Sequence, residues 1–156
     1  MAKVGRASRN SSLMRVETLG NGTSAPTAKT IGDAETGEVY FIDHNHASAL
    51  TITLPALKAG AYFRFQLKTK LANNGTIVIQ SKDATNGDFA GGIVEQVLNA
   101  ADGAVSYQLC GAHHILTIND DANIGSVVEC VCDGTAWNWT GTVLTEAVGP
   151  NVEFST

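Results

Sequence analysis

The feature that most constrains the fold is a series of short apolar runs, separated by turn signals roughly ten residues apart. Leu50–Leu54 alternates apolar residues with threonine, and Tyr62–Leu67 places Phe63, Phe65 and Leu67 on one side of an extended chain. No long segment shows the 3.6-residue period of an amphipathic helix. The sequence therefore predicts an all-β protein with low helix content, folded as an antiparallel β-sandwich, a jelly-roll-like arrangement or a barrel.

The predicted strands are rich in β-branched and aromatic residues and are bordered by Gly, Asn, Asp or Pro. They are residues 39–42, 50–54, 62–67, 76–80, 104–109, 114–118, 126–132, 136–140 and 143–145, with 93–98 as either a strand or a helical turn. Asn73-Asn74-Gly75 predicts a hairpin that returns residues 76–80 alongside residues 62–67. The expected core consists of Phe41, Leu50, Ile52, Phe63, Phe65, Ile77, Ile79, Tyr107, Leu116, Val128, Cys130 and either Trp137 or Trp139.

Charge divides the chain into two parts. Four cations precede the first carboxylate, Glu17: Lys3, Arg6, Arg9 and Arg15. The six remaining cations face all fifteen carboxylates, so residues 16–156 carry a net charge near −9. Residues 1–30 lack periodicity and are predicted to form an extended basic arm, and residues 31–156 are predicted to form the β-sandwich domain.

The arm suggests an acidic protein surface as its partner. Nucleic acid is a second target for a basic arm, but four charges without aromatic residues predict only weak, salt-sensitive binding. A solvated tail without a partner remains a third interpretation. No apolar stretch approaches the ~18 residues of a membrane span, so no membrane partner is expected.

The three cysteines predict reduced thiols, because their number is odd and no secretory signal precedes them. Cys130 and Cys132 lie two residues apart in a predicted strand and share a face with Val128. They are expected to act as small buried apolar residues.

Catalytic and metal-binding signatures are absent or weak. The sequence has no nucleophile elbow, P-loop, dinucleotide fingerprint or H-E-x-x-H motif, so neither enzymatic activity nor a cofactor is expected. The histidines could in principle hold zinc, but a polar turn and a strand edge explain them as well: His44, His46, His113 and His114. Two Asp/Asn-rich loops lack the spacing of a calcium loop and are explained by Asx turns: Asp83, Asn86 and Asp88 in one, and Asp120, Asp121 and Asn123 in the other.

Trp137 and Trp139 lie on one face of a predicted strand. If exposed, the pair could stack on a sugar ring. If buried, it belongs to the core or to a seam between subunits, where Trp is enriched. The pair is thus a candidate partner-binding site.

Several runs together resemble a known class of proteins. They are Leu50-Thr51-Ile52-Thr53-Leu54-Pro55, the aromatic strand after Gly60, Thr76-Ile77-Val78-Ile79, Gly91-Gly92, and the stretch G-S-V-V-E-x-V-x-D-G-T-x-W from Gly125 to Trp137. This order resembles small β-rich virion proteins of tailed bacteriophages, including capsid decoration (cement) proteins and head or tail-fibre modules. The resemblance covers roughly residues 51–141 and leaves the basic arm out.

The resemblance implies a virion protein that is made in the host bacterial cytoplasm and lies on the capsid exterior. Such proteins bind the major capsid protein on an expanded head, commonly as homotrimers, and bridge neighbouring subunits. An arm carrying Lys3, Arg6, Arg9 and Arg15 could order on a neighbouring subunit, and many copies on one shell would give avidity. The alternative is a tail-fibre, tail or head–neck module that binds a host glycan or receptor.

Overall fold

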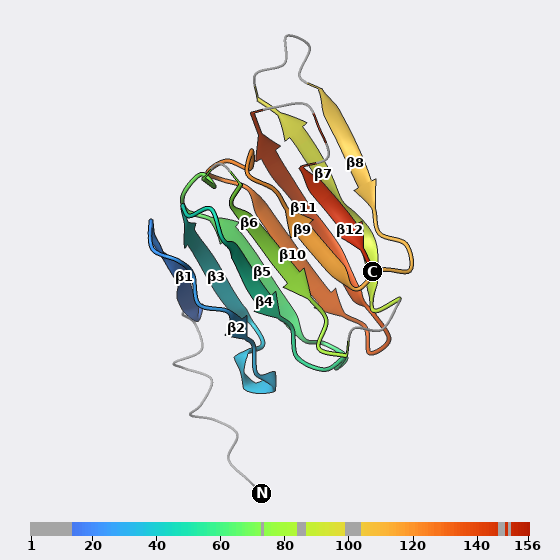
Figure 1. The fold of residues 1–156 in the computed structure, drawn as a ribbon. Coiled ribbons are helices and arrows are strands. Elements are labelled where there is room, and N and C mark those ends of the chain that lie inside the picture. The colour runs from blue at the N-terminus through green and yellow to red at the C-terminus, as the bar shows by residue number, and fades with distance from the viewer. Residues whose placement is uncertain (1–13, 73, 84–86, 99–103, 147–148, 150) are drawn as a thin grey trace, which may run out of the picture.

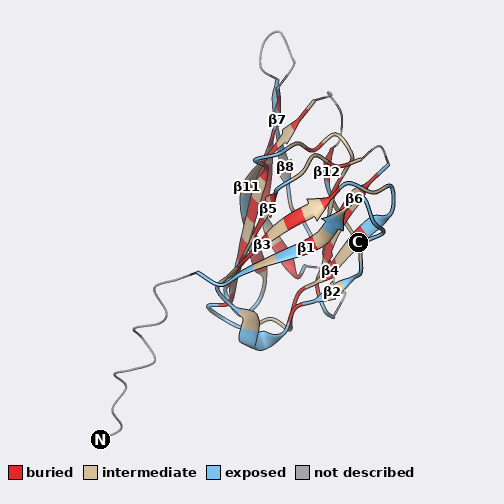
Figure 2. Ribbon diagram, turned by 90° about the vertical axis from the view of Figure 1, so that its left-hand side faces the viewer, coloured by how far each residue is buried: buried red, intermediate tan, exposed pale blue. Residues whose placement is uncertain are grey.

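Two β-sheets packed face to face make up the protein (Figures 1 and 2). The computed structural model describes residues 14–156 except 73, 84–86, 99–103, 147–148 and 150. One short 3₁₀ turn, Asp33–Glu35, is the helical element of the described residues. None of those residues forms a helix long and apolar enough to cross a bilayer.

The larger sheet has seven strands, here called the large sheet. In spatial order they are β1 (Val16–Gly22), β3 (Glu38–His44), β5 (Tyr62–Leu67), β10 (Val127–Cys132), β11 (Trp137–Thr145), β7 (Phe89–Val97) and β8 (Val105–Leu109). The small sheet has five strands. Their order is β12 (Val152–Ser155), β9 (Ile115–Ile118), β6 (Thr76–Gln80), β4 (Ala49–Thr53) and β2 (Lys29–Thr30).

The all-β sandwich with little helix is confirmed, but its strands are not all antiparallel. From β1 to β6, consecutive strands alternate between the two sheets, so strands two apart in the chain become neighbours running in the same direction. The pairs β1–β3, β3–β5, β7–β11, β2–β4 and β4–β6 are parallel. Both sheets are therefore mixed.

The predicted hairpin between residues 62–67 and 76–80 is wrong. β5 lies in the large sheet and β6 in the small one, so the turn between them carries the chain across the sandwich. Asn74 adopts a left-handed φ of 64°, and its backbone N–H donates to Asp120 Oδ2 at 2.8 Å. Asn73 lies outside the described residues. The sequence predicts a turn at this position, and Asn74 has the backbone conformation of one. A turn signal does not specify which sheet receives the next strand.

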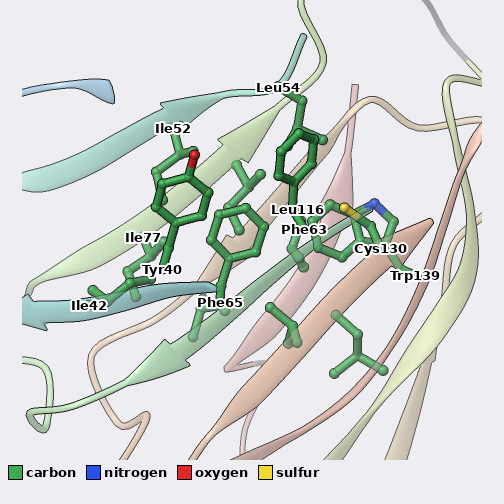
Figure 3. Close-up of a cluster of buried hydrophobic side chains, with 14 of the residues drawn as sticks. Tyr40, Ile42, Ile52, Leu54, Phe63, Phe65, Ile77, Leu116, Cys130 and Trp139 are labelled. Atoms are coloured by element: carbon green, nitrogen blue, oxygen red, sulfur yellow. The ribbon is translucent and has the colours of Figure 1, made fainter. Parts of the chain in front are cut away.

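Aromatic rings fill the space between the sheets (Figure 3). Tyr40 stacks on Phe65 with ring centroids 5.5 Å apart, and Phe63 lies 5.6 Å from Trp137. Val128, Cys130 and Cys132 share the buried face of β10, as predicted. Burying this apolar surface is the main force that holds the two sheets together.

Two residues expected in the core lie elsewhere. Phe41 is only partly buried, because the register of β3 turns Tyr40 and Ile42 inward instead. Tyr107 is 56% exposed, because it points outward from β8. Residues 39–42 form a continuous apolar run, so alternation could not tell which side faced inward.

The predicted boundary at residue 30 also differs from the structure. Val16–Gly22 and Lys29–Thr30 are strands, so the sandwich begins at Val16 and not at residue 31. β1 is an edge strand with a single buried residue, Leu19, which explains why its sequence shows no periodicity. Residues 1–13 lie outside the described residues.

Candidate interaction surface

Arg15 is the one predicted arm cation among the described residues, and it contacts its own chain. Its side chain is 68% exposed, with Nη1 donating to the carbonyl of Ala34 at 3.3 Å and lying 3.7 Å from Glu38 Oε1. A surface contact of this kind contributes little stability. The other three candidates lie outside the described residues: Lys3, Arg6 and Arg9.

The tryptophan pair belongs to the core. Trp137 and Trp139 are 0% and 3% exposed, respectively, and Trp139 packs edge-on against Phe89 with ring centroids 5.2 Å apart. Neither indole N–H meets an acceptor among the described residues. The rings cannot stack on a sugar while the sandwich is closed, so their assignment as partner-binding residues is corrected to a core role.

The histidines do not converge on a common site. His46 Nδ1 accepts the N–H of Ser48, and His113 Nδ1 accepts the N–H of Gly111. Among the described residues, the group of side chains close enough to share a metal ion consists of glutamates and contains no histidine. The zinc arrangement considered from sequence therefore has no geometric support.

Side-chain oxygens of the two Asp/Asn-rich loops accept hydrogen bonds from other residues of the chain. Asp120 accepts the N–H of Asn74, Asn123 Oδ1 accepts the N–H of Ile124, and Asp88 accepts the hydroxyl of Ser81. Asn86 lies outside the described residues. None of these three bonds has the i to i+2 spacing of an Asx turn, so the Asx-turn interpretation stays a prediction.

Three carboxylates gather beside the β1 edge. Oxygens of Glu17, Glu35 and Glu38 lie within 4.8 Å of one another. Lys29 Nζ lies 2.8 Å from Glu17 Oε2 and 2.6 Å from Glu35 Oε1, and the Tyr40 hydroxyl donates to Glu38 at 3.0 Å. We call Lys29, Glu17 and Glu35 the Lys29 clasp, because they join β1, β2 and the 3₁₀ turn.

Electrostatics favour the charged forms in this clasp. Burial alone lowers the pKa of Lys29, but hydrogen bonds and charge interactions with Glu17 and Glu35 outweigh it and raise that pKa. Burial likewise opposes ionisation of Glu35, yet the Gly32 N–H and the Lys29 ammonium hold the pKa of Glu35 below its ordinary value. The lysine already occupies the centre of the cluster, so the clasp is a structural link between strands.

The most exposed apolar feature among the strands is the outer edge of the large sheet opposite β1. Val105, Tyr107 and Leu109 of β8 are 64%, 56% and 71% exposed, respectively, and we call them the β8 strip. β8 itself contains no charged residue. An exposed apolar strip on an edge strand is typical of an interaction surface. Of these three residues, Tyr107 is expected in the core from sequence, because alternation alone does not show whether a face is covered.

A buried carboxylate of β7 lies next to β8. Glu95 of β7 is 1% exposed and accepts a hydrogen bond from Asn151 Nδ2 at 2.7 Å. The Ser106 hydroxyl reaches Glu95 Oε2 at 3.5 Å. Ser106 is exposed but lies on the same face of the sheet as Glu95, and the β8 strip lies on the opposite face.

Comparisons with models of protein families, with curated proteins and with solved structures found no match to this chain. Its function is therefore inferred from its own residues.

Proposed function

We propose that this protein is a non-enzymatic structural component of a virion, which binds the outer surface of a phage head and bridges neighbouring capsid subunits. The observation that carries the proposal is the separation of charge. Four cations lie in the first 15 residues, and a body with a net charge near −9 follows. The first strand begins at Val16, so the basic residues precede the sandwich instead of lying in its sheets.

The fold suits such a role. A sandwich with an aromatic core is rigid, and 16% charged residues leave few long side chains to order when copies pack side by side. A basic segment on an acidic body can bind an acidic neighbour, and repetition over a shell strengthens each modest contact. Self-association of the protein, which the resemblance implies, belongs to the same proposal. The glycan-binding alternative loses the residues that suggested it, because both tryptophans are buried.

The test compares two charge-reversal variants of the full chain. In the arm variant, Lys3, Arg6 and Arg9 are changed to Glu. In the matched control, three exposed lysines of the body are changed to Glu: Lys58, Lys68 and Lys82. Both variants have the same net charge, so they separate position from total charge.

Co-sedimentation with expanded heads that lack the protein measures binding, and head stability to heat measures bridging. We expect the arm variant to bind at least about tenfold more weakly, with a reduced dependence on salt, while the control binds like the wild type. Equal binding by the arm variant and the wild type would show that the arm is not the clamp. Failure of the wild-type chain to bind heads would refute the proposed function.

A further inference from the structure

The outward edge of β8 carries unpaired backbone groups. In the ladder with β7, the Cys110 N–H donates to the Gly91 carbonyl and the Val97 N–H to the Ala104 carbonyl. Every second residue of an antiparallel strand forms a hydrogen-bonded pair with its neighbour. Ser106 and Gln108, which lie between positions 104 and 110 at this spacing, therefore turn their N–H and C=O groups toward β7. The N–H and C=O groups of the β8 strip consequently point away from the sheet, and no backbone hydrogen bond from the described residues reaches them.

The sequence of β8 is complementary to itself. Read in either direction, Val105-Ser106-Tyr107-Gln108-Leu109 runs apolar, polar, aromatic, polar, apolar. If a second copy pairs antiparallel with Tyr107 opposite Tyr107, then Val105 lies opposite Leu109 and Ser106 opposite Gln108. In this register the edge-facing N–H and C=O groups of the β8 strip lie opposite the same groups of the second copy. The two strands can therefore form hydrogen-bonded pairs.

The edge also lacks the usual protection against pairing. Such edges are commonly blocked by lysine, proline, a bulge or an inward-pointing charge, and β8 has none of these. Its neutrality matters because each copy carries a net charge of −5, and this strand brings no like charges together. In Figure 1, β8 forms the outer margin of the large sheet, with no strand beyond it.

The side chain of Tyr107 lies close to Gly92 of β7. A Cβ on Gly92 would lie 2.8 Å from the Tyr107 hydroxyl oxygen, so the ring covers the bare backbone of Gly92 on the outer face. A large residue at position 92 would push the ring away. The ring therefore leans toward β7 and leaves the backbone edge of β8 uncovered.

We propose that two copies of this chain pair through β8, antiparallel and about a two-fold axis at Tyr107, to form a continuous sheet across the dimer. The inference deepens the self-association within the proposed function. It replaces the expected trimer by a contact that closes at two copies. The contact is derived from β8 alone, so it can fail while head binding stands, and head binding can fail while the contact stands.

Sedimentation of the full chain over a wide range of concentrations tests the pairing. We expect the wild type to dimerise and Tyr107→Lys to dimerise at least about tenfold more weakly, because the two new lysines face each other across the axis. The matched control is Val131→Lys on β10, which is 47% exposed on an interior strand of the same sheet, and it should dimerise like the wild type. Far-UV circular dichroism establishes that each variant is folded.

A charge exchange tests the register. Val105→Lys combined with Leu109→Lys places like charges opposite each other and should abolish pairing. Val105→Lys combined with Leu109→Glu places opposite charges together and should restore it. A monomeric wild type, a trimer whose mass Tyr107→Lys leaves unchanged, or equal pairing by the two double variants would each overturn the proposal.

Discussion

The two edges of the large sheet are built in opposite ways. β1 lies beside the Lys29 clasp, and its ladder with β3 shifts register between Leu19 and Gly22. A cleft of about 340 Å³ separates part of β1 from residues 25–29, which run beside it. β8 ends the sheet with an uncharged strand of unbroken register, whose apolar side chains are exposed.

The difference shows which edge is available for pairing. Charges and an irregular ladder make β1 a poor template for another strand, whereas β8 keeps its register over all five residues. A protein protected from aggregation in general would block both edges. Protection of one edge alone favours a specific contact at the other.

The largest expected effect on stability comes from a substitution in β1. Gly20 has φ = 84°, and a Cβ there would lie 2.3 Å from the Asp43 carbonyl oxygen. Gly20→Ala should therefore lower the free energy of unfolding by about 3 kcal/mol, from left-handed strain plus a backbone clash. Urea denaturation monitored by tryptophan fluorescence measures the loss.

Gly22→Ala is the matched control for Gly20→Ala. Gly22 has a similar φ of 73°, but the nearest atom to its Cβ would be 3.9 Å away. The control carries the strain without the clash, so we expect a loss of about 1 kcal/mol. Equal losses in the two variants would contradict the close approach of β1 to Asp43. Neither variant should change pairing at β8.

The strands themselves were largely predictable, because most sandwich strands have one buried face and so alternate, although β1 and residues 39–42 do not. Residues 62–67 and 76–80 were predicted with the same bounds that the structure has. Their placement in different sheets was not predictable, because a turn signal such as that at Asn74 is local. A local signal specifies a reversal of the chain but not the identity of the neighbouring strand.

The candidate site was harder to predict because edges are properties of the sheet order. Alternation showed that Val105, Tyr107 and Leu109 share a face, but an edge strand can expose the face that an interior strand would bury. The same limit applies to Trp137, whose alternation fits both a core and an exposed site. Arg15 shows that charge alone does not identify a partner, because the carboxylate beside it belongs to Glu38 of the same chain.

A smaller effect sharpens the account of the protected edge. Lys29→Met removes the cation of the clasp and leaves Glu17 and Glu35 without their ammonium partner, next to the third carboxylate of Glu38. Because the clasp is partly solvated, we expect a loss of about 1 kcal/mol in the free energy of unfolding near pH 7. Lys68→Met is the control. It removes a more exposed pair with Asp43, whose atoms lie 3.2 Å apart, so it should have a smaller effect.

The pH dependence of Lys29→Met follows from the shifted groups. The folded pKa of Glu35 lies below 4.5, so the stability it contributes is present above pH 4.5 and is lost as the pH falls through the folded pKa. The folded pKa of Lys29 lies above 10.5, so its contribution persists until the pH rises past that value. The difference between wild type and Lys29→Met should therefore be constant at neutral pH and shrink in acid. A difference that grows in acid would contradict the clasp.

The smallest expected effect concerns a thiol at the end of the open edge. Cys110 follows β8, and burial raises its pKa to about 11, although a hydrogen bond from the His113 backbone acts in the opposite direction. Because the thiolate is the reactive form, labelling by a thiol reagent should be slow at pH 7 and should accelerate toward pH 11. Cys130 and Cys132 are buried and should label only on unfolding.

Cys110 also reports on pairing at β8. In the proposed register it lies opposite the partner's Ala104, so its labelling rate should fall as protein concentration rises. Tyr107→Lys should remove this concentration dependence, because it requires a second copy. The pH dependence should remain, because it arises from burial of Cys110 within one chain. A concentration dependence that persists in Tyr107→Lys would place the contact elsewhere, and the asymmetry between the two edges would then need another cause.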